Sequence, residues 1–340
     1  MESPDWSATP TLADVAERAG VSKATASKAL AGRYDVGAST RERVLEAAEA
    51  LNFRPNLLAR GLGGGKTQTV GVITSDLDAR FAPQIMMGAE DALGADRSSV
   101  IMCNSRGDPE MEKHHIEELL RRSVDGLILV GDYPEARARL AVSVPVPVVY
   151  AYSFSTDRDD ASVICDNVAA GRMATKHLLE CGKRNIVHIG GLESELAARS
   201  RAAGCKMGMK AAGMQLVMKE PLFGDWTEQW GWETTARLID DDVAFDGLVC
   251  GNDQIARGAL DQLAARGLRV PDDVAVIGFD NWSVLARDSR QPFTSVDMNL
   301  AEVGRKAARL LTDSAARRGV HRVTGRVVVR GSTRPETELG

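Results

Sequence analysis

The sequence predicts an α + α/β protein, in which a small N-terminal helical module precedes a two-lobed, doubly wound α/β body. Over residues 11–51 the apolar residues recur at helical spacing around a tight Gly-Val turn. After residue 68 short apolar runs alternate with amphipathic stretches, which is typical of parallel strands with helices on both faces of a sheet. Three consecutive glycines at positions 63–65 separate the two patterns and break regular structure.

The helical module begins with a capping signal, because Thr11 is followed three residues later by Asp14. The first helix has one apolar face, which is formed by Leu12, Val15, Ala16 and Ala19. After the Gly-Val turn, Ser22 is the expected N-cap of a second helix that ends near Gly32. A third helix is expected from about Ser39 to Leu51. Its inward residues are expected to be Val44, Leu45, Ala48 and Leu51.

Seven segments of the body are predicted to be buried parallel strands. They are TVGVITSD, SVIMCNS, GLILVGD, VPVVYAYS, NIVHIGG, FDGLVCGND and VAVIGFDN. Four of them precede a helical stretch that contains His177 and three follow it, which indicates two lobes. Near the C-terminus, the segment Pro292–Leu300 is expected to return the chain to the first lobe.

The distribution of charge favours local binding of phosphate. The whole chain has a net charge of −5, which alone argues against nucleic acid. Residues 18–66, however, carry nine Lys/Arg against four Asp/Glu, whereas residues 67–340 carry 33 against 39. A small basic module on an acidic body can contact DNA while the body stays away from it.

The composition disfavours several classes of protein. No apolar run approaches the roughly 20 residues that span a bilayer, and the first ten residues lack the basic and apolar regions of a secretory signal. We therefore expect a cytoplasmic protein with no membrane partner. The five cysteines are odd in number and never spaced as CxxC, so we expect neither disulfides nor a metal site. No cofactor is expected.

The outer face of the second helix is short, polar and basic. Its members are Lys23, Ala24, Ser27 and Lys28, opposite the apolar residues Ala26, Ala29 and Leu30. A major groove admits such a helix, and residues near the helix N-terminus reach base edges. The hydroxyls of Ser22, Thr25 and Ser27 suit phosphate. The alternative is an ordinary helical hairpin whose basic face is only solvated.

A family resemblance is carried by two stretches, TLADVAERAGVSKATASKALAG and TRERVLEAAEALNFRPNLLARGL. Together they resemble the headpiece of the LacI/GalR family of bacterial transcription regulators, which has a helix-turn-helix. This chain departs from the family pattern at Ala26, where valine is usual, at Lys28, where arginine is usual, and at Ala31-Gly32, where an asparagine often stands. Lysine forfeits the bidentate fork that arginine offers to guanine. These departures bear on which bases are read.

The resemblance implies that Asn56–Leu62 is a hinge helix, which folds only on operator DNA and in a dimer. It implies that Leu62 wedges into the minor groove, with Ala59 and Arg60 beside it. Seven residues are far fewer than the roughly 12–15 that make a marginal free helix, and Gly61 weakens it further. Alternatively, the leucines of this segment dock on the headpiece or the body. The candidate DNA-binding residues are Ser22, Lys23, Ala24, Thr25, Ser27, Lys28, Arg33, Asn56, Ala59, Arg60 and Leu62.

Polar and aromatic residues follow the predicted strands of the body, where α/β sheets bind ligands. Carboxylates, amides and a guanidinium around aromatic plates are the usual chemistry for holding a sugar. The candidate ligand-binding residues are Ser75, Asp76, Asp78, Tyr152, Arg201, Trp226, Asn252, Asp253 and Asp280. Each also has a structural alternative: the acids as helix caps, the tryptophan as packing and the arginine in an ion pair.

The body resembles the periplasmic-binding-protein-like core of the same regulators. On that resemblance Asn252 and Asp253 border a cleft, Asp280 takes a sugar-hydroxyl position and Arg201 holds the ligand. Gly224–Trp226 resembles an aromatic lid, and Tyr152 falls at a polar contact position. Asn281 and Met298 replace polar residues that are frequent in the family, which bears on the identity of the ligand.

We therefore expect a helix-turn-helix domain, a hinge and a two-lobed domain that binds a small molecule and dimerises. The expected ranges are a tail at 1–10, the helix-turn-helix domain at 11–55, the hinge and linker at 56–66 and the body at 67–340. The first lobe is expected at about 67–165 and 297–325, and the second at about 166–296 and 326–337.

The leading hypothesis is a sequence-specific transcriptional regulator, acting as a repressor. A homodimer would bind a palindromic operator and be released by a carbohydrate-like effector, with corepression as the alternative. A sugar-binding protein of a transporter would share the body but leave the headpiece unexplained. An enzyme using Asp253 or Asp280 is disfavoured because no catalytic motif or metal-ligand spacing occurs.

Overall fold

A computed structural model of the chain describes residues 10–30, 32, 35–53, 67–75, 81–94, 98–140, 143–288, 291–313 and 318–334. The chain divides into two compact units, Met1–Thr67 and Gln68–Gly340, which are described separately below. None of the helices in these ranges combines the length and the hydropathy that crossing a bilayer requires.

The first unit contains three helices around a small apolar core. They are α1 (Leu12–Ala19), α2 (Lys23–Leu30) and α3 (Ala38–Ala50). The predicted capping box is present at the start of α1, where Thr11 and Asp14 exchange hydrogen bonds. Gly20 ends α1 with a φ of 66°, a left-handed conformation that favours glycine and turns the chain into α2. Small core residues such as Ala26 and Ala29 let the three helices pack closely.

One predicted core residue of this unit is wrong. Leu45 is 50% exposed, whereas Val44, Ala47 and Ala48 form the buried face of α3. Successive residues of an α-helix are separated by about 100° around the axis. Leu45 therefore falls beside the buried stripe, and the shorter Ala47 takes the inward position.

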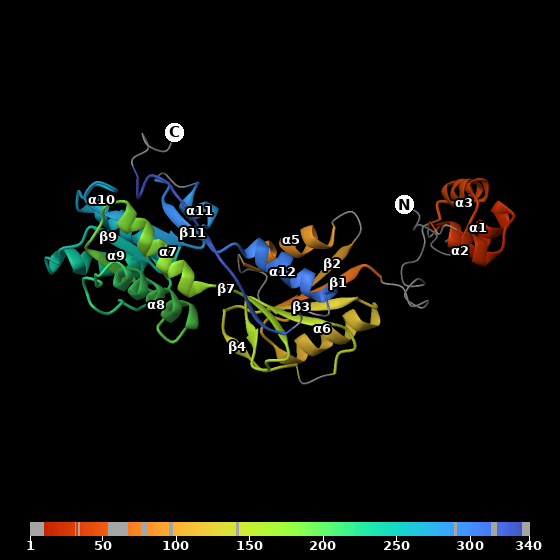
Figure 1. Ribbon diagram of the computed structural model, residues 1–340, viewed down its shortest axis with the longest axis horizontal. Helices are drawn as coiled ribbons and strands as arrows, with labels where there is room; N and C mark the ends of the chain where they lie inside the picture. Colours follow the sequence, from red (N-terminus) through yellow and green to blue (C-terminus); the bar gives the residue numbers. More distant parts are fainter. Residues whose placement is uncertain are drawn as a thin grey trace, which may run out of the picture. The chain divides into compact units, whose positions relative to one another are not determined.

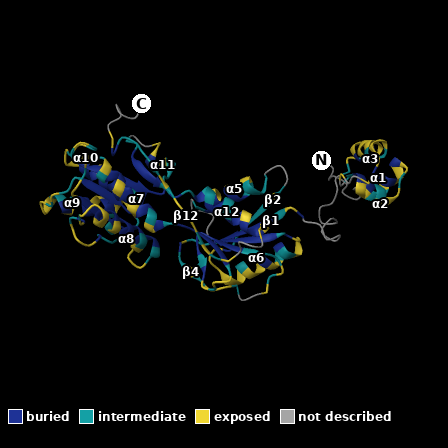
Figure 2. Ribbon diagram, viewed as in Figure 1, coloured by how far each residue is buried: buried dark blue, intermediate teal, exposed yellow. Residues whose placement is uncertain are grey.

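The second unit has two large sheets with helices on both faces of each (Figures 1 and 2). The first sheet is fully parallel, with the order β12-β7-β5-β3-β1-β2. Its strands are β1 (Thr69–Thr74), β2 (Ser99–Asn104), β3 (Gly126–Val130), β5 (Val148–Ala151), β7 (Ala161–Cys165) and β12 (Gly319–Val323). One face is covered by α5 (Phe81–Leu93) and α12 (Leu300–Thr312), the other by α6 (Pro109–Arg121).

The second sheet has the order β13-β11-β10-β9-β8. Its strands are β8 (Ile186–Ile189), β9 (Gly247–Cys250), β10 (Ala275–Phe279), β11 (Thr294–Asp297) and the antiparallel β13 (Arg326–Val328). One face packs on α7 (Asn167–Glu180) and α8 (Leu196–Ala211), the other on α9 (Glu228–Asp240) and α10 (Asp253–Ala265). The short α11 (Ser283–Ala286) follows β10.

The seven predicted strands are all present, and the two-lobed α/β architecture is confirmed. The chain passes from one sheet's lobe to the other after β7, after β11 and between β12 and β13. The segment Pro292–Leu300 thus contributes β11 to the second sheet before it leads into α12 of the first lobe. A two-stranded parallel ribbon, β4 (Ala136–Arg137) with β6 (Phe154–Ser155), extends the first lobe.

Three helix pairs cross with their backbones almost in contact, and a glycine on each helix permits the approach. A Cβ added to Gly304 of α12 would lie 1.8 Å from the carbonyl oxygen of Ile85 on α5, and one on Gly88 would lie 1.9 Å from that of Ala301. The same reciprocal contact joins α7 to α8 through Gly171 and Gly204. A third joins α9 to α10 at a pair of glycines, Gly231 and Gly258.

A buried histidine in the second sheet should make stability depend on pH. His188 on β8 is buried, and one ring nitrogen lies 2.8 Å from the Val249 carbonyl oxygen. Burial lowers the pKa of His188 from 6.5 to about 4. Between these pH values the unfolded chain binds a proton at this histidine that the folded chain does not bind. The contribution of His188 to the free energy of unfolding is therefore complete above pH 6.5. It falls by about 1.4 kcal/mol for each pH unit of acidification between pH 6.5 and pH 4.

The test is denaturant unfolding at a series of pH values for the protein and for His188→Leu. We expect the variant to lose stability less steeply between pH 6.5 and pH 4. His114→Leu, at an exposed position of α6, serves as the matched control and should keep the original slope. Equal slopes for all three proteins would contradict a neutral buried His188.

Candidate functional site

The outer face of α2 is presented to solvent. Ser22, Lys23, Ala24, Ser27 and Lys28 are exposed, and Thr25 is half-buried. Ala26 and Ala29 on the opposite face are buried in the three-helix core. The predicted recognition surface is thus formed by one helix face of described residues, and it carries two lysines on a helix of eight residues.

The N-terminal end of α2 is fixed by its own hydroxyls. The Thr25 backbone N–H donates to Ser22 Oγ at 3.1 Å, and the two side-chain hydroxyls lie 2.9 Å apart. Lys28 forms an exposed ion pair with Asp35 at 2.6 Å. Exposed pairs contribute only about 0–1 kcal/mol, so Lys28 can exchange this carboxylate for a phosphate or a guanine at small cost. Arg33, Asn56, Ala59, Arg60 and Leu62 lie outside the described residues.

A hollow of 340 Å³ lies between the two lobes of the second unit, at the carboxyl ends of the strands. It is lined by Phe81, Tyr133, Pro134, Tyr152, Glu195, Ala197, Arg201, Trp226, Asn252, Gln254, Asp280 and Trp282. Five of the predicted ligand-binding residues meet here: Tyr152, Arg201, Trp226, Asn252 and Asp280. Because an aromatic lining with a few polar groups is typical of small-molecule sites, this hollow is the candidate ligand cleft.

Arg201 is the most constrained side chain of the cleft. Its guanidinium donates to Asn167 Oδ1 at 2.9 Å, to the Gly251 carbonyl at 2.5 Å and to Asp280 Oδ1 at 3.2 Å. The side chain is only 5% exposed, and its guanidinium carbon lies 4.8 Å from the centre of the Phe279 ring. Since three acceptors and a ring fix the guanidinium, any remaining donor that it offers to a ligand has a defined direction.

Two predicted site residues do not line the cleft. Asp253 is fully buried, and its carboxylate accepts hydrogen bonds from Ser295 Oγ and the Trp282 backbone N–H, both at 2.6 Å. It therefore holds Trp282, which does line the cleft. Ser75 donates its hydroxyl to Asp132 in the first lobe. Asp76 and Asp78 lie outside the described residues.

Asn252 serves the cleft partly as a helix cap. Its Oδ1 accepts from the Ile255 backbone N–H at 2.8 Å, which caps α10. Its Nδ2 lies 3.4 Å from the Trp226 carbonyl oxygen. Helix capping, which was the structural alternative for the acidic residues after the strands, is thus a role of Asn252. The same amide joins α10 to the segment that carries Trp226.

Two cleft residues have left-handed backbone conformations. Tyr152 has a φ of 65° and Asp280 a φ of 91°. Such conformations cost side-chain-bearing residues about 1–3 kcal/mol each and persist where the surroundings impose them. The backbone N–H of Tyr152 donates to Val163, and that of Asp280 to Val296. These bonds to neighbouring strands hold both residues at the edge of the cleft.

Several aromatic residues of the cleft were absent from the sequence-based set. Phe81 packs on Tyr152 with ring centres 5.0 Å apart, and Tyr133 and Trp282 complete the lining. Tyr133 and Trp282 lie three residues beyond β3 and β10, so the rule of reading strand ends could have found them. Phe81 begins a helix, and no local pattern distinguishes it from packing.

Glu135 and Glu195 face each other across the two lobes. Glu195 Oε2 accepts from Trp226 Nε1 at 2.9 Å, and burial raises the pKa of Glu195, with the nearby Glu135 carboxylate adding to the rise. Glu135 in the first lobe accepts a hydrogen bond from the Leu196 backbone N–H, the first amide of α8 in the second lobe. The N-cap residue of α8 makes no side-chain cap bond of its own, so the cap comes from the other lobe.

Comparison with known protein families separates the same two parts of the chain. Residues 11–56 match the model of bacterial regulatory proteins of the lacI family. Residues 175–333 match the periplasmic binding protein-like domain. The first match covers the three helices, and the second covers most of the second lobe together with β11, α12, β12 and β13.

Relatives of known function extend these matches over nearly the whole chain. Catabolite control protein A of Priestia megaterium is 35% identical over 304 residues, which cover 89% of this chain and 91% of that protein. The lac repressor dimer bound to operator and the anti-inducer ONPF has a TM-score of 0.76 at 27% identity, covering 96% and 99% of the two chains. The complex of the transcriptional regulator CelR with cellobiose has a TM-score of 0.60 at 29% identity, covering 95% and 99%.

These proteins are regulators of transcription and not enzymes, and their similarity covers both the exposed α2 helix and the interlobe cleft. A free-standing sugar-binding protein is not favoured, because it would leave the helix-turn-helix unit without a role. The chain belongs to the lacI family of bacterial regulatory proteins and is a DNA-binding transcriptional regulator.

Proposed function

We propose that the protein is a cytoplasmic repressor whose dimer binds a palindromic operator and releases it when a small carbohydrate-like effector occupies the cleft. Residues 11–55 would read the operator, 56–66 would form the hinge, and 67–340 would dimerise and sense the effector. The effector would contact both lobes and bias their relative angle, so that hinge folding and DNA affinity change together.

The observation that carries this proposal is that one chain joins an exposed, basic recognition helix to an interlobe cleft lined by aromatic and hydrogen-bonding groups. Tyr152, Trp226 and Trp282 offer flat apolar surfaces for the C–H face of a sugar ring. Arg201, Asn252 and Asp280 offer polar groups for its hydroxyls. The matching structures that hold operator, ONPF and cellobiose support the same division of roles.

The direct experiment is fluorescence anisotropy with labelled DNA from the region upstream of the protein's own gene and with sheared DNA of random sequence. Glucose, galactose, mannose and xylose are then titrated, together with their di- and trisaccharides. We expect tighter binding to a specific site and release by one of these saccharides. Equal affinity for both DNAs would refute the sequence-specific regulator, and tighter binding with saccharide would make the effector a corepressor.

A lysine on the recognition helix should contribute a measurable part of the operator affinity. Replacing Lys23 with alanine removes a charged donor from the exposed face near the N-terminus of α2. A base-reading contact contributes about 1–3 kcal/mol, so operator affinity should fall about 5- to 150-fold. If Lys23 contacts phosphate instead, affinity should fall for all DNA sequences. The slope of the logarithm of affinity against the logarithm of salt concentration should then decrease by about one.

Lys210→Ala is the matched control, because Lys210 is an exposed lysine on α8 of the body. Its operator affinity and salt dependence should equal those of the unchanged protein. Equal affinities for Lys23→Ala and Lys210→Ala would remove Lys23 from the DNA-binding surface.

A further inference from the structure

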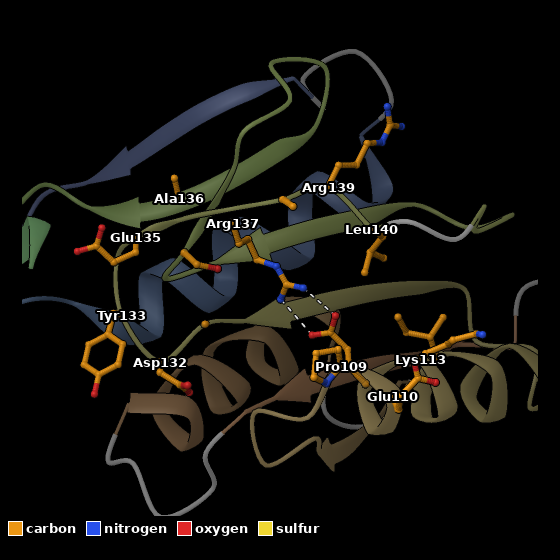
Figure 3. Close-up of a pocket in the computed structure, with 15 residues that line it drawn as sticks. Pro109, Glu110, Lys113, Asp132, Tyr133, Glu135, Ala136, Arg137, Arg139 and Leu140 are labelled. Atoms are coloured by element: carbon orange, nitrogen blue, oxygen red, sulfur yellow. Dashed lines mark hydrogen bonds and ion pairs between the residues drawn. The ribbon is translucent and has the colours of Figure 1, made fainter.

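A second hollow lies in the first lobe beside the interlobe cleft. It has a volume of 510 Å³, and its walls come from the start of α6, the segment after β3 and the β4 strand. Figure 3 shows Tyr133 at one end of it, Arg137 in the middle and Lys113 at the opposite end. Tyr133 also lines the cleft, so the two hollows share one wall.

Both arginines that line this second hollow are held in ion pairs. Arg137 forms two hydrogen bonds to the Glu112 carboxylate, at 2.7 and 3.1 Å, and lies over the Tyr150 ring at 5.6 Å. Arg139 pairs with Asp157 at 2.8 Å. The guanidinium groups of the lining are therefore already neutralised by carboxylates.

The remaining lining is an apolar floor with polar groups at the rim. Ile116, Ala138 and Leu140 contribute the apolar surface. At the rim, the Lys113 ammonium and the Glu110 carboxylate are exposed and make no side-chain hydrogen bond or ion pair with the described residues. The carboxylates of Asp132 and Glu135 also line the hollow, where they accept hydrogen bonds from Ser75 and from the Leu196 backbone N–H. One ammonium donor and several carboxylate acceptors around an apolar floor can bind the hydroxyls of a neutral molecule.

Tyr133 connects the two hollows. It is 55% exposed, an unusual position for a large aromatic side chain, and it stands where a molecule leaving the cleft would enter the second hollow. An exposed tyrosine ring provides a stacking surface for a sugar and a hydroxyl for its polar groups.

We infer that the effector is an oligosaccharide, whose first ring occupies the cleft and whose next ring crosses Tyr133 into the second hollow. The inference rests on the proposed sugar response and adds the length of the ligand and a second subsite. A monosaccharide uses the cleft alone. A di- or trisaccharide of the same sugar uses both hollows and binds more tightly.

The test compares the saccharide series in the unchanged protein and in two variants of the second hollow. Ala138→Trp fills the hollow from an exposed position, and Lys113→Ala removes a rim donor. Ser143→Trp, at an exposed position of the same β3–β5 connection but outside the hollow, is the matched control. Saccharide binding is measured by calorimetry on the full-length protein, and operator release by anisotropy.

We expect the unchanged protein and the control to bind a di- or trisaccharide about tenfold more tightly than the matching monosaccharide, which corresponds to about 1.4 kcal/mol of further binding free energy. Ala138→Trp should abolish this preference, and Lys113→Ala should reduce it, without a change in monosaccharide binding. A preference for length that survives in both variants, or none in the unchanged protein, overturns the second subsite while leaving the cleft in place. If no saccharide of any length binds, the proposed sugar response fails and the subsite with it.

Discussion

Replacing Arg201 with alanine should abolish the response to the effector and destabilise the body of the protein, while operator binding persists. The guanidinium is buried, and its loss removes the hydrogen bonds that it donates to Asp280 and Asn167. Removing one member of a buried ion pair costs about 3–5 kcal/mol. A domain of this size has about 5–15 kcal/mol of stability in total, so the variant should fold but melt at a lower temperature.

The measurements are thermal unfolding and operator release by a saccharide that acts on the unchanged protein. Arg199→Ala is the matched control, because Arg199 is an exposed residue on the same helix whose guanidinium donates only to backbone carbonyls. Arg201→Lys keeps the charge but cannot reach three acceptors in fixed directions, so it should recover part of the stability and little of the response. A normal saccharide midpoint in Arg201→Ala would remove this residue from the site.

The substitution Gly304→Ala should destabilise the first lobe by about 3 kcal/mol or more, which is the upper part of the range for overpacked cores. The added Cβ would lie 1.8 Å from the Ile85 carbonyl oxygen, and backbone cannot move aside by a change of rotamer. The helices α5 and α12 would have to separate. Because α12 directly follows one of the crossings between the lobes, the response to effector should change as well.

Thermal unfolding and operator release again provide the measurement. Gly208→Ala is the milder comparison, since its added Cβ would lie 2.9 Å from the Thr175 side chain and 3.3 Å from the nearest backbone carbonyl oxygen, that of Arg172. We expect a clearly smaller loss of stability there. Equal losses for the two variants would contradict a special role for the backbone crossing of α5 and α12.

The fold could be predicted because its signals are local. Thr11 and Asp14 mark a helix start, and a run such as GLILVGD marks a buried strand whatever surrounds it. The error at Leu45 shows that such signals do not determine the burial of every single residue. Helical spacing defines a stripe, and the sequence does not indicate which residue at its margin meets the neighbouring helices.

The cleft could be predicted only in outline. The ends of parallel strands identified Tyr152, Asn252 and Asp280, because the sheet itself gathers these positions. The same rule selected Asp253 and Ser75, whose side chains bond to Ser295 and to Asp132 instead of lining the cleft. The direction of a side chain just beyond a strand depends on local backbone conformation, which the sequence pattern does not contain.

The contact between Glu135 and the first amide of α8 affects the balance of populations between lobe arrangements. An N-cap contributes about 1 kcal/mol to its helix, and this one is present only while the two lobes keep these atoms together. A difference of that size changes a ratio of populations by about fivefold. Losing this cap therefore lowers the population of any arrangement that separates the lobes at this point by about fivefold. An effector that stabilises such an arrangement must offset this free energy by binding it more tightly than the arrangement in which the cap is present. A substitution at Glu135, which lines the second hollow and not the interlobe cleft, should therefore shift the effector concentration that releases the operator, with the DNA-reading surface unchanged.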